Sequence, residues 1–262
     1  MPLFSCWKDE AGTFAIWKTE ESNEALRASL KGAFPYDADL SRLKAESRRS
    51  EYLAVRVLLA EVCGEEKEIC HEPSGKPFLA DGSFRLSISH TRGYVAVALH
   101  PEREVGIDIE QVSERALKVA DRFMCGEELA GQAEALKGCP EEAEQAALYY
   151  VLLHWSAKET LYKLMGEEEV DFSRHLRILP FRLRPEGRFS GCECRTRQAG
   201  RYEIRYMLHP DFVCTWSMGL YWFAKKLNAE TLRRRGIKLE KAKATEPNWI
   251  FSVTPDLQSG VT

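Results

Sequence analysis

The sequence predicts a mixed α+β protein built from two lobes of similar size. Strand-like and helical segments are interspersed in both halves of the chain, and they do not recur as the repeats of a solenoid would. With 44% hydrophobic and 29% charged side chains, 262 residues can bury a substantial core. We therefore expect a lobe at residues 1–104, a second lobe at 105–225, and a basic, mobile tail at 226–262.

The apolar periodicity gives each lobe its own set of elements. The first lobe is predicted to hold a strand near 14–17, helices near 21–31 and 40–62, and strands near 84–89 and 94–99. The second lobe is predicted to begin with a strand at 105–110, followed by helical stretches near 115–123 and 141–165. Short strands near 176–183, 202–207 and 213–222 follow, with turn signals at Pro185-Glu186-Gly187 and Ala199-Gly200.

The strand at 105–110 brings two carboxylates to one face. Apolar residues at 105, 107 and 109 alternate with Gly106, Asp108 and Glu110, and successive side chains of a strand point to opposite faces. Two carboxylates about 7 Å apart repel each other unless a cation lies near, and such hard oxygen ligands suit magnesium. The pattern predicts a shared metal ion; the alternative is a solvent-facing strand that alternates apolar and acidic residues.

The helix predicted at 141–165 carries a second charged group. Trp155, Glu159 and Lys163 follow at intervals of four and share one face. Glu159 is placed to complete a metal site and Lys163 to meet a phosphate, while Lys158, about 100° around the helix, would reach another part of a ligand. The alternative is an ordinary Glu-Lys pair on a wet face, against which Trp155 suggests a partly enclosed wall.

A third group lies upstream of both. Gly75-Lys76-Pro77 predicts a turn, in which glycine allows close approach to a planar or anionic ligand and proline sets the direction of exit. Ser89 and His90 follow at the end of a predicted strand and offer a hydroxyl and an imidazole. A lone histidine serves more often in structure than in binding, so that alternative stays open for His90.

In order and spacing, these groups resemble the 4'-phosphopantetheinyl transferases, specifically the larger two-lobed type represented by the surfactin synthetase activator. The resemblance is carried by Gly75 to Pro77, Ser89 and His90, Gly106 to Glu110, and Trp155 to Lys163. It runs from about Arg48 to Met165 and fades outside that stretch.

The resemblance implies transfer of the phosphopantetheine arm of coenzyme A to a serine of an apo acyl or peptidyl carrier protein, with release of 3',5'-ADP. It also implies a pseudo-twofold monomer, with coenzyme A in the cleft between the lobes and magnesium or manganese as the metal. The carrier would belong to fatty acid, polyketide or nonribosomal peptide biosynthesis.

The resemblance assigns roles to individual residues as well. Asp108, Glu110 and Glu159 match the metal ligands, and Glu159 and Lys163 are the catalytic candidates. Glu159 would act as general base, either directly or through a metal-bound water, and both routes stay open. The candidates for coenzyme A binding are Arg49, Arg56, Gly75, Lys76, Pro77, Ser89, His90, Asp108, Lys158 and Lys163.

Arg49 and Arg56 are the least direct of these candidates. They lie seven residues apart on one face of the helix predicted at 40–62. The resemblance brings basic side chains of this region toward the 3'-phosphate of coenzyme A, a dianion that an arginine fork suits. The alternative is a solvated basic face opposite Leu53 and Val57.

Charge, hydropathy and cysteine spacing favour a cytoplasmic enzyme over a nucleic-acid-binding, membrane or secreted protein. A net charge of −3 and a pI near 6.1 offer no general attraction to nucleic acid. No run of eighteen apolar residues occurs, and the first ten residues lack the apolar core of a signal peptide. The eight cysteines have no regular spacing and predict free thiols, and Cys192-Glu193-Cys194 lacks the second pair that a zinc site needs.

Two rival functions are weaker. A noncatalytic binder would be expected to lose a metal ligand or Lys163, yet all are present, and a P-loop phosphotransferase needs a glycine loop that is absent.

We expect the carrier protein to contact residues 165–177, just after the long helix. The basic tail would steer an acidic carrier; its alternative is a solvated helix with a disordered end.

Overall fold

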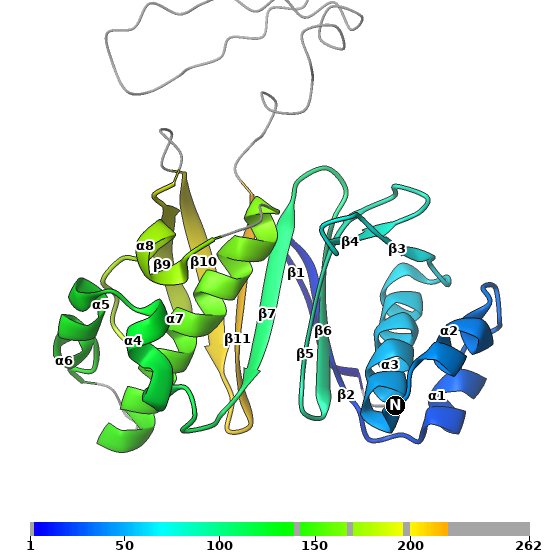
Figure 1. Ribbon diagram of the computed structural model, residues 1–262, viewed down its shortest axis with the longest axis horizontal. Coiled ribbons are helices and arrows are strands. Elements are labelled where there is room, and N and C mark those ends of the chain that lie inside the picture. Colours follow the sequence, from blue (N-terminus) through cyan, green and yellow to red (C-terminus); the bar gives the residue numbers. More distant parts are fainter. Residues whose placement is uncertain (1–2, 139–141, 167–169, 196–199, 220–262) are drawn as a thin grey trace, which may run out of the picture. The chain divides into compact units, whose positions relative to one another are not determined.

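The computed structural model describes residues 3–138, 142–166, 170–195 and 200–219, which belong to a compact unit within residues 1–220. They form a mixed α+β structure, as predicted (Figure 1). The tail predicted at 226–262 lies outside the described residues, as does the end of the strand predicted at 213–222. Among the described helices, none is both long enough and apolar enough to span a bilayer.

The first sheet has four antiparallel strands in the order β1-β2-β6-β5. The strands are β1 (Leu3–Asp9), β2 (Gly12–Lys18), β5 (Arg85–Thr91) and β6 (Tyr94–His100). The helices of this half are α1 (Asn23–Ala28), α2 (Tyr36–Arg42) and α3 (Glu46–Cys63), and a separate ribbon pairs β3 (Ile69–His71) with β4 (Pro77–Leu79). Helix α3 lies beside this sheet (Figure 1). Its Leu53 and Leu58 belong to one core with Val97 of the sheet.

The second sheet has five antiparallel strands in the order β7-β11-β10-β9-β8. They are β7 (Val105–Gln111), β8 (Leu176–Ile178), β9 (Glu186–Glu193), β10 (Arg201–Leu208) and β11 (Phe212–Met218). Helix α7 (Ala143–Met165) covers this sheet (Figure 1). Its Leu153 and Leu161 belong to one buried core with Ile204. The short helices are η1 (Leu117–Val119), α4 (Ala120–Phe123), α5 (Gly126–Ala130), α6 (Gln132–Ala135) and α8 (Phe172–His175).

The two sheets are joined through hydroxyl groups. Backbone N–H groups of β7 donate to side chains of β5: Ile107 N to Ser87 Oγ (3.2 Å), Ile109 N to Ser89 Oγ (3.3 Å) and Gln111 N to Thr91 Oγ1 (3.0 Å). Both strands lie at the edge of their own sheet, where backbone N–H groups need partners outside the ladder. These bonds hold Asp108 and Glu110 in register with Ser89 and His90.

The helix predicted at 40–62 is wrong in one respect, because the chain breaks it into α2 and α3. Leu43 and Ala45, between the two, have extended backbone. Leu40 and Leu53 pack into the same core, yet on one straight helix thirteen residues would set them about 140° apart. The break lets both side chains reach that core.

The strands also differ from prediction in the second lobe. The strand predicted at 176–183 ends at Ile178, two residues before Pro180, which has no N–H to donate to a ladder. Strand β9 begins within the predicted turn at 185–187, and its Gly187 and Gly191 weaken the sequence signal for a strand. Strand β1 was also not predicted, although it completes the edge of the first sheet.

Candidate functional site

Strand β7 and helix α7 approach so closely at Gly106 that no other side chain fits. A Cβ added to Gly106 would lie 2.5 Å from the backbone oxygen of Thr160 and 3.0 Å from Cγ of Leu164. Because the Thr160 oxygen belongs to the helix backbone, it cannot rotate away. Glycine at this position therefore allows Asp108, two residues along the strand, to face the charged side of α7.

A buried cluster of hydroxyl groups also holds α7 against strand β11. The Thr215 hydroxyl on β11 lies 2.9 Å from Ser156 Oγ and 2.7 Å from Thr160 Oγ1. All three side chains are inaccessible to solvent. Satisfied buried networks of this kind favour a single arrangement of the elements they join. The helix is therefore fixed in rotation, which determines the direction of Glu159 and Lys163.

Asp108 is the central acidic group, and it is buried. Its Oδ1 accepts hydrogen bonds from Ser89 Oγ (2.9 Å) and Lys163 Nζ (2.8 Å). Its Oδ2 is buried without a hydrogen-bond partner among the described residues. Lys163 donates a second hydrogen bond to the Ile107 carbonyl at 3.0 Å, and an ammonium group has three donors. One N–H of Lys163 and one oxygen of Asp108 therefore remain for a ligand.

Glu110 and Glu159 extend the acidic group from the strand and the helix. Trp155 Nε1 donates to Glu110 Oε1 at 2.7 Å, and the Trp155 ring packs against Phe123 and Phe172 with centroids 5.1 Å and 5.5 Å away. Burial, followed by the charge of Asp108, raises the pKa of Glu110 to about 7 and that of Glu159 to about 7. Carboxyl groups respond in this way when they share an enclosed site with too little positive charge.

These residues fit the chemistry of a hard divalent cation. The donor set is three carboxylates with one lysine beside them, it includes an orphaned buried oxygen, and a cation would stabilise the charged forms of both glutamates. In the part of the chain that the structure describes, no three acidic, histidine or cysteine side chains already converge closely enough to coordinate an ion. The metal site therefore stays a prediction, whose ligands would have to draw together.

The predicted turn at Gly75 is present, and it leads into β4. Gly75 has a φ of 84°, in the left-handed region, and its N–H donates to Glu72 O at 2.8 Å. Lys76 Nζ pairs with Glu104 Oε2 at 2.6 Å and lies 3.5 Å from the position of a Cβ on Gly166, at the end of α7. Lys76 therefore lies near the far end of the helix that carries Glu159 and Lys163.

His90 lies beside Arg48, a basic residue of helix α3 that is not among the predicted binding residues. Arg48 Nη1 donates to His90 Nε2 at 3.2 Å and pairs with Glu51 Oε2 at 2.9 Å. Arg49 instead donates to the Leu43 carbonyl, and Arg56 lies over the ring of Tyr52, 3.3 Å from its centroid. The binding of Arg49 and Arg56 to the 3'-phosphate, which was predicted from their seven-residue spacing, therefore stays a prediction.

Lys158 has a structural role instead of the ligand contact that we expected. Its side chain is fully buried, and its ammonium donates to Phe123 O (2.7 Å), Glu128 Oε2 (2.7 Å) and Phe172 O (3.1 Å). All three donors are therefore used within the protein. The sequence near Lys158 carries no signal of these partners, which lie 14 to 35 residues away along the chain.

Glu128, the partner of Lys158, was not predicted either. It accepts hydrogen bonds from Cys125 N and Ile178 N, both at 2.8 Å, and is only 5% exposed. The pair connects α5, α7 and β8 and fixes the wall on which Phe123 and Phe172 lie.

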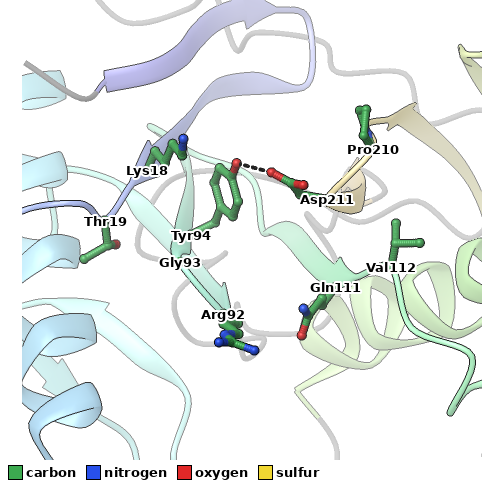
Figure 2. A pocket seen from close by; sticks show the side chains of 9 residues that line it. All are labelled: Lys18, Thr19, Arg92, Gly93, Tyr94, Gln111, Val112, Pro210 and Asp211. Carbon is green, nitrogen blue, oxygen red and sulfur yellow. Dashed lines mark hydrogen bonds between the residues drawn. The ribbon is translucent and has the colours of Figure 1, made fainter.

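A cavity of about 350 Å³ opens at the end of β7 (Figure 2). Its lining includes Lys18, Arg92, Tyr94, Gln111, Pro210 and Asp211. The Tyr94 hydroxyl donates to Asp211 Oδ2 at 2.7 Å. The cavity begins one residue beyond Glu110 and contains none of the predicted site residues.

Three carboxylates and a lysine on one strand and one helix suit phosphoryl transfer, in which a metal ion and a cationic side chain neutralise phosphate charge. Residues 104–220 match the family model of the 4'-phosphopantetheinyl transferase superfamily. This region contains Asp108, Glu110, Glu159 and Lys163. The chain belongs to the 4'-phosphopantetheinyl transferase superfamily, so the expectation of an enzyme of this family is confirmed.

Curated relatives carry the same family name. The chain is 29% identical over 169 residues to the 4'-phosphopantetheinyl transferase psf-1 of Bacillus pumilus, covering 59% of this chain and 68% of the relative. It is 32% identical over 134 residues to the 4'-phosphopantetheinyl transferase AcpT of Salmonella typhimurium, covering 50% of this chain and 66% of the relative. It is 24% identical over 149 residues to the L-aminoadipate-semialdehyde dehydrogenase-phosphopantetheinyl transferase of Xenopus laevis, covering 51% and 48% respectively.

Proposed function

We propose that the protein transfers the 4'-phosphopantetheine arm of coenzyme A to a serine of an apo acyl or peptidyl carrier protein and releases 3',5'-ADP. The observation that carries this proposal is the group of Asp108, Glu110, Glu159 and Lys163, which lies inside the region that matches the family model.

Asp108, Glu110 and Glu159 are the residues that would hold magnesium or manganese. The unpartnered Oδ2 of Asp108 and the raised pKa of both glutamates support this assignment. When bound, the ion would neutralise charge on the pyrophosphate of coenzyme A and on the leaving group. Trp155 Nε1 donates to one oxygen of Glu110, which would leave the other oxygen for the ion.

Glu159 is our candidate for the general base. Its carboxylate would accept the proton of the serine hydroxyl, directly or through one water. Lys163 already holds the acidic strand through Asp108, and its remaining N–H is available to a pyrophosphate oxygen.

We place coenzyme A in a cleft between lobes 1–104 and 105–225, related by a pseudo-twofold axis in a monomer. The hydroxyl bonds between β5 and β7 support this placement, because they bring Ser89 and His90 next to the acidic strand. Ser89, His90 and Arg48 would then face the phosphates. Lys76 would reach the adenine nucleotide after leaving Glu104.

The test is the mass of a carrier protein after incubation with the protein, coenzyme A and magnesium. We expect a phosphopantetheine mass on the carrier serine, and no addition when that serine is replaced by alanine or when a chelator removes the metal. A panel of fatty acid, polyketide and peptide carriers would identify the pathway. Coenzyme A binding with every carrier left unmodified would contradict the proposal and favour a noncatalytic binder.

A further inference from the structure

Two cysteines outside the candidate site lie in contact at the end of β9. Cys192 Sγ and Cys194 Sγ are 3.9 Å apart. Cys192 is half-buried and Cys194 is exposed, and neither is in a disulfide. In the part of the chain that the structure describes, no other two thiols lie within hydrogen-bonding distance of each other. The two side chains therefore form a dithiol.

The backbone at this point allows the two sulfur atoms to come closer. Residues two apart on a strand are separated by about 6.6 Å, near the upper end of the Cα separation of about 4.4–6.8 Å found in disulfides. Strand β9 ends at Glu193, so Cys194 lies beyond the ladder. Its N–H donates to the His175 carbonyl at 2.7 Å, which anchors its backbone while the side chain can turn.

The surroundings of the two thiols differ, and this sets the order of their reactions. Burial raises the pKa of Cys192 to about 11, with a further contribution from Cys194 beside it. Arg177 and Arg201, which pair with Cys192 across the two neighbouring strands, act in the opposite direction. Exposed Cys194 is therefore the first nucleophile. Once Cys194 is bound to another sulfur it carries no charge, and the two arginines then favour the Cys192 thiolate.

We propose that Cys192 and Cys194 are a thiol modification site that closes to an intrachain disulfide by exchange with a low-molecular-weight disulfide. The Cys194 thiolate attacks one sulfur of glutathione disulfide, which forms a mixed disulfide and releases one glutathione thiolate. The Cys192 thiolate then attacks Cys194 Sγ and releases the second glutathione. The protein loses two electrons and two protons, and one glutathione disulfide becomes two thiols.

The test uses the folded, full-length protein and oxidised glutathione at about pH 8, where thiolates are more abundant. After acid quenching and alkylation of the remaining thiols, trypsin releases both cysteines in one peptide, residues 189–195. We expect this peptide to carry no alkyl group and to be two hydrogen atoms lighter than the reduced, unalkylated peptide. A peptide that is fully alkylated, or that keeps glutathione on Cys194, would overturn the proposal.

Two variants and one control make the result specific. In Cys192→Ser, we expect a stable glutathione adduct on Cys194, because no second thiol can displace it. In Cys194→Ser, little adduct should form on half-buried Cys192. The wild-type reaction is repeated in urea, where the fold no longer holds the thiols in contact. Ring closure should be slower there, and equal rates in the folded and unfolded chain would contradict a site built by the fold.

Discussion

Replacing Gly106 by alanine tests how the candidate site is assembled. The new Cβ would lie 2.5 Å from the Thr160 backbone oxygen and 3.0 Å from Leu164 Cγ. Side chains alone cannot relieve the first contact, so α7 must move away from β7. Overpacking of this kind costs about 1–3 kcal/mol, and we expect a loss near the upper end because the contact is with backbone. A misplacement of about 1 Å at reacting groups can lower a rate about 100-fold.

The matched control is Gly126→Ala, at the first position of α5. A Cβ at Gly126 has no heavy atom within 4 Å, and its φ lies outside the left-handed region. We expect its stability to be unchanged or up to about 1 kcal/mol higher. Urea unfolding gives the free energies, and carrier modification gives kcat/KM. If Gly106→Ala matches Gly126→Ala in both assays, the argument that glycine sets the approach of α7 is refuted.

Three further predictions concern side chains of helix α7. Burial lowers the pKa of His154 to about 4, so between about pH 6.5 and 4 the unfolded chain binds a proton that the folded chain does not, and the free energy of unfolding falls with falling pH by about 3 kcal/mol in all. Urea unfolding of His154→Gln should lack this part of the pH dependence, and a pH profile equal to that of the wild type would count against it. Lys158→Met leaves Glu128 buried without its partner and should lower the unfolding free energy by about 3–5 kcal/mol, whereas adding Glu128→Gln should restore much of the loss; a single-variant loss below about 1 kcal/mol would contradict this. Trp155→Phe keeps an aromatic ring but removes the donor to Glu110, so the magnesium concentration for half-maximal activity should rise and the unfolding free energy should fall by about 1 kcal/mol. An unchanged magnesium dependence would argue against this role of Trp155.

Local pattern predicted the elements of the candidate site well. The alternation at 105–110 and the four-residue spacing at 155–163 lie on a strand and a helix, as expected. Both periods are properties of a short segment, so the sequence carries them directly. The contact between Lys163 and Asp108 spans 55 residues. It was not predicted, because the family resemblance implied only that both residues belong to one site.

The features that sequence reasoning missed depend on distant partners. The ammonium of Lys158 can be buried because Glu128 and two carbonyl groups accept its hydrogen bonds. The sequence of its own helix does not indicate these partners. The division of α2 from α3 likewise follows from a shared core that both helices reach. The contact of Arg48 with His90 likewise joins residues 42 positions apart in the chain. Residue spacing alone does not give such tertiary positions.

The central claim is that the Asp108, Glu110, Glu159 and Lys163 group catalyses transfer to a carrier serine. The most direct test compares wild type with Glu159→Gln, which keeps the size of the side chain and removes its charge, by the mass of an apo carrier over time with coenzyme A and magnesium. We predict phosphopantetheine addition by the wild type and a rate at least about 100-fold lower in the variant. Equal rates of addition by the two proteins would contradict the account.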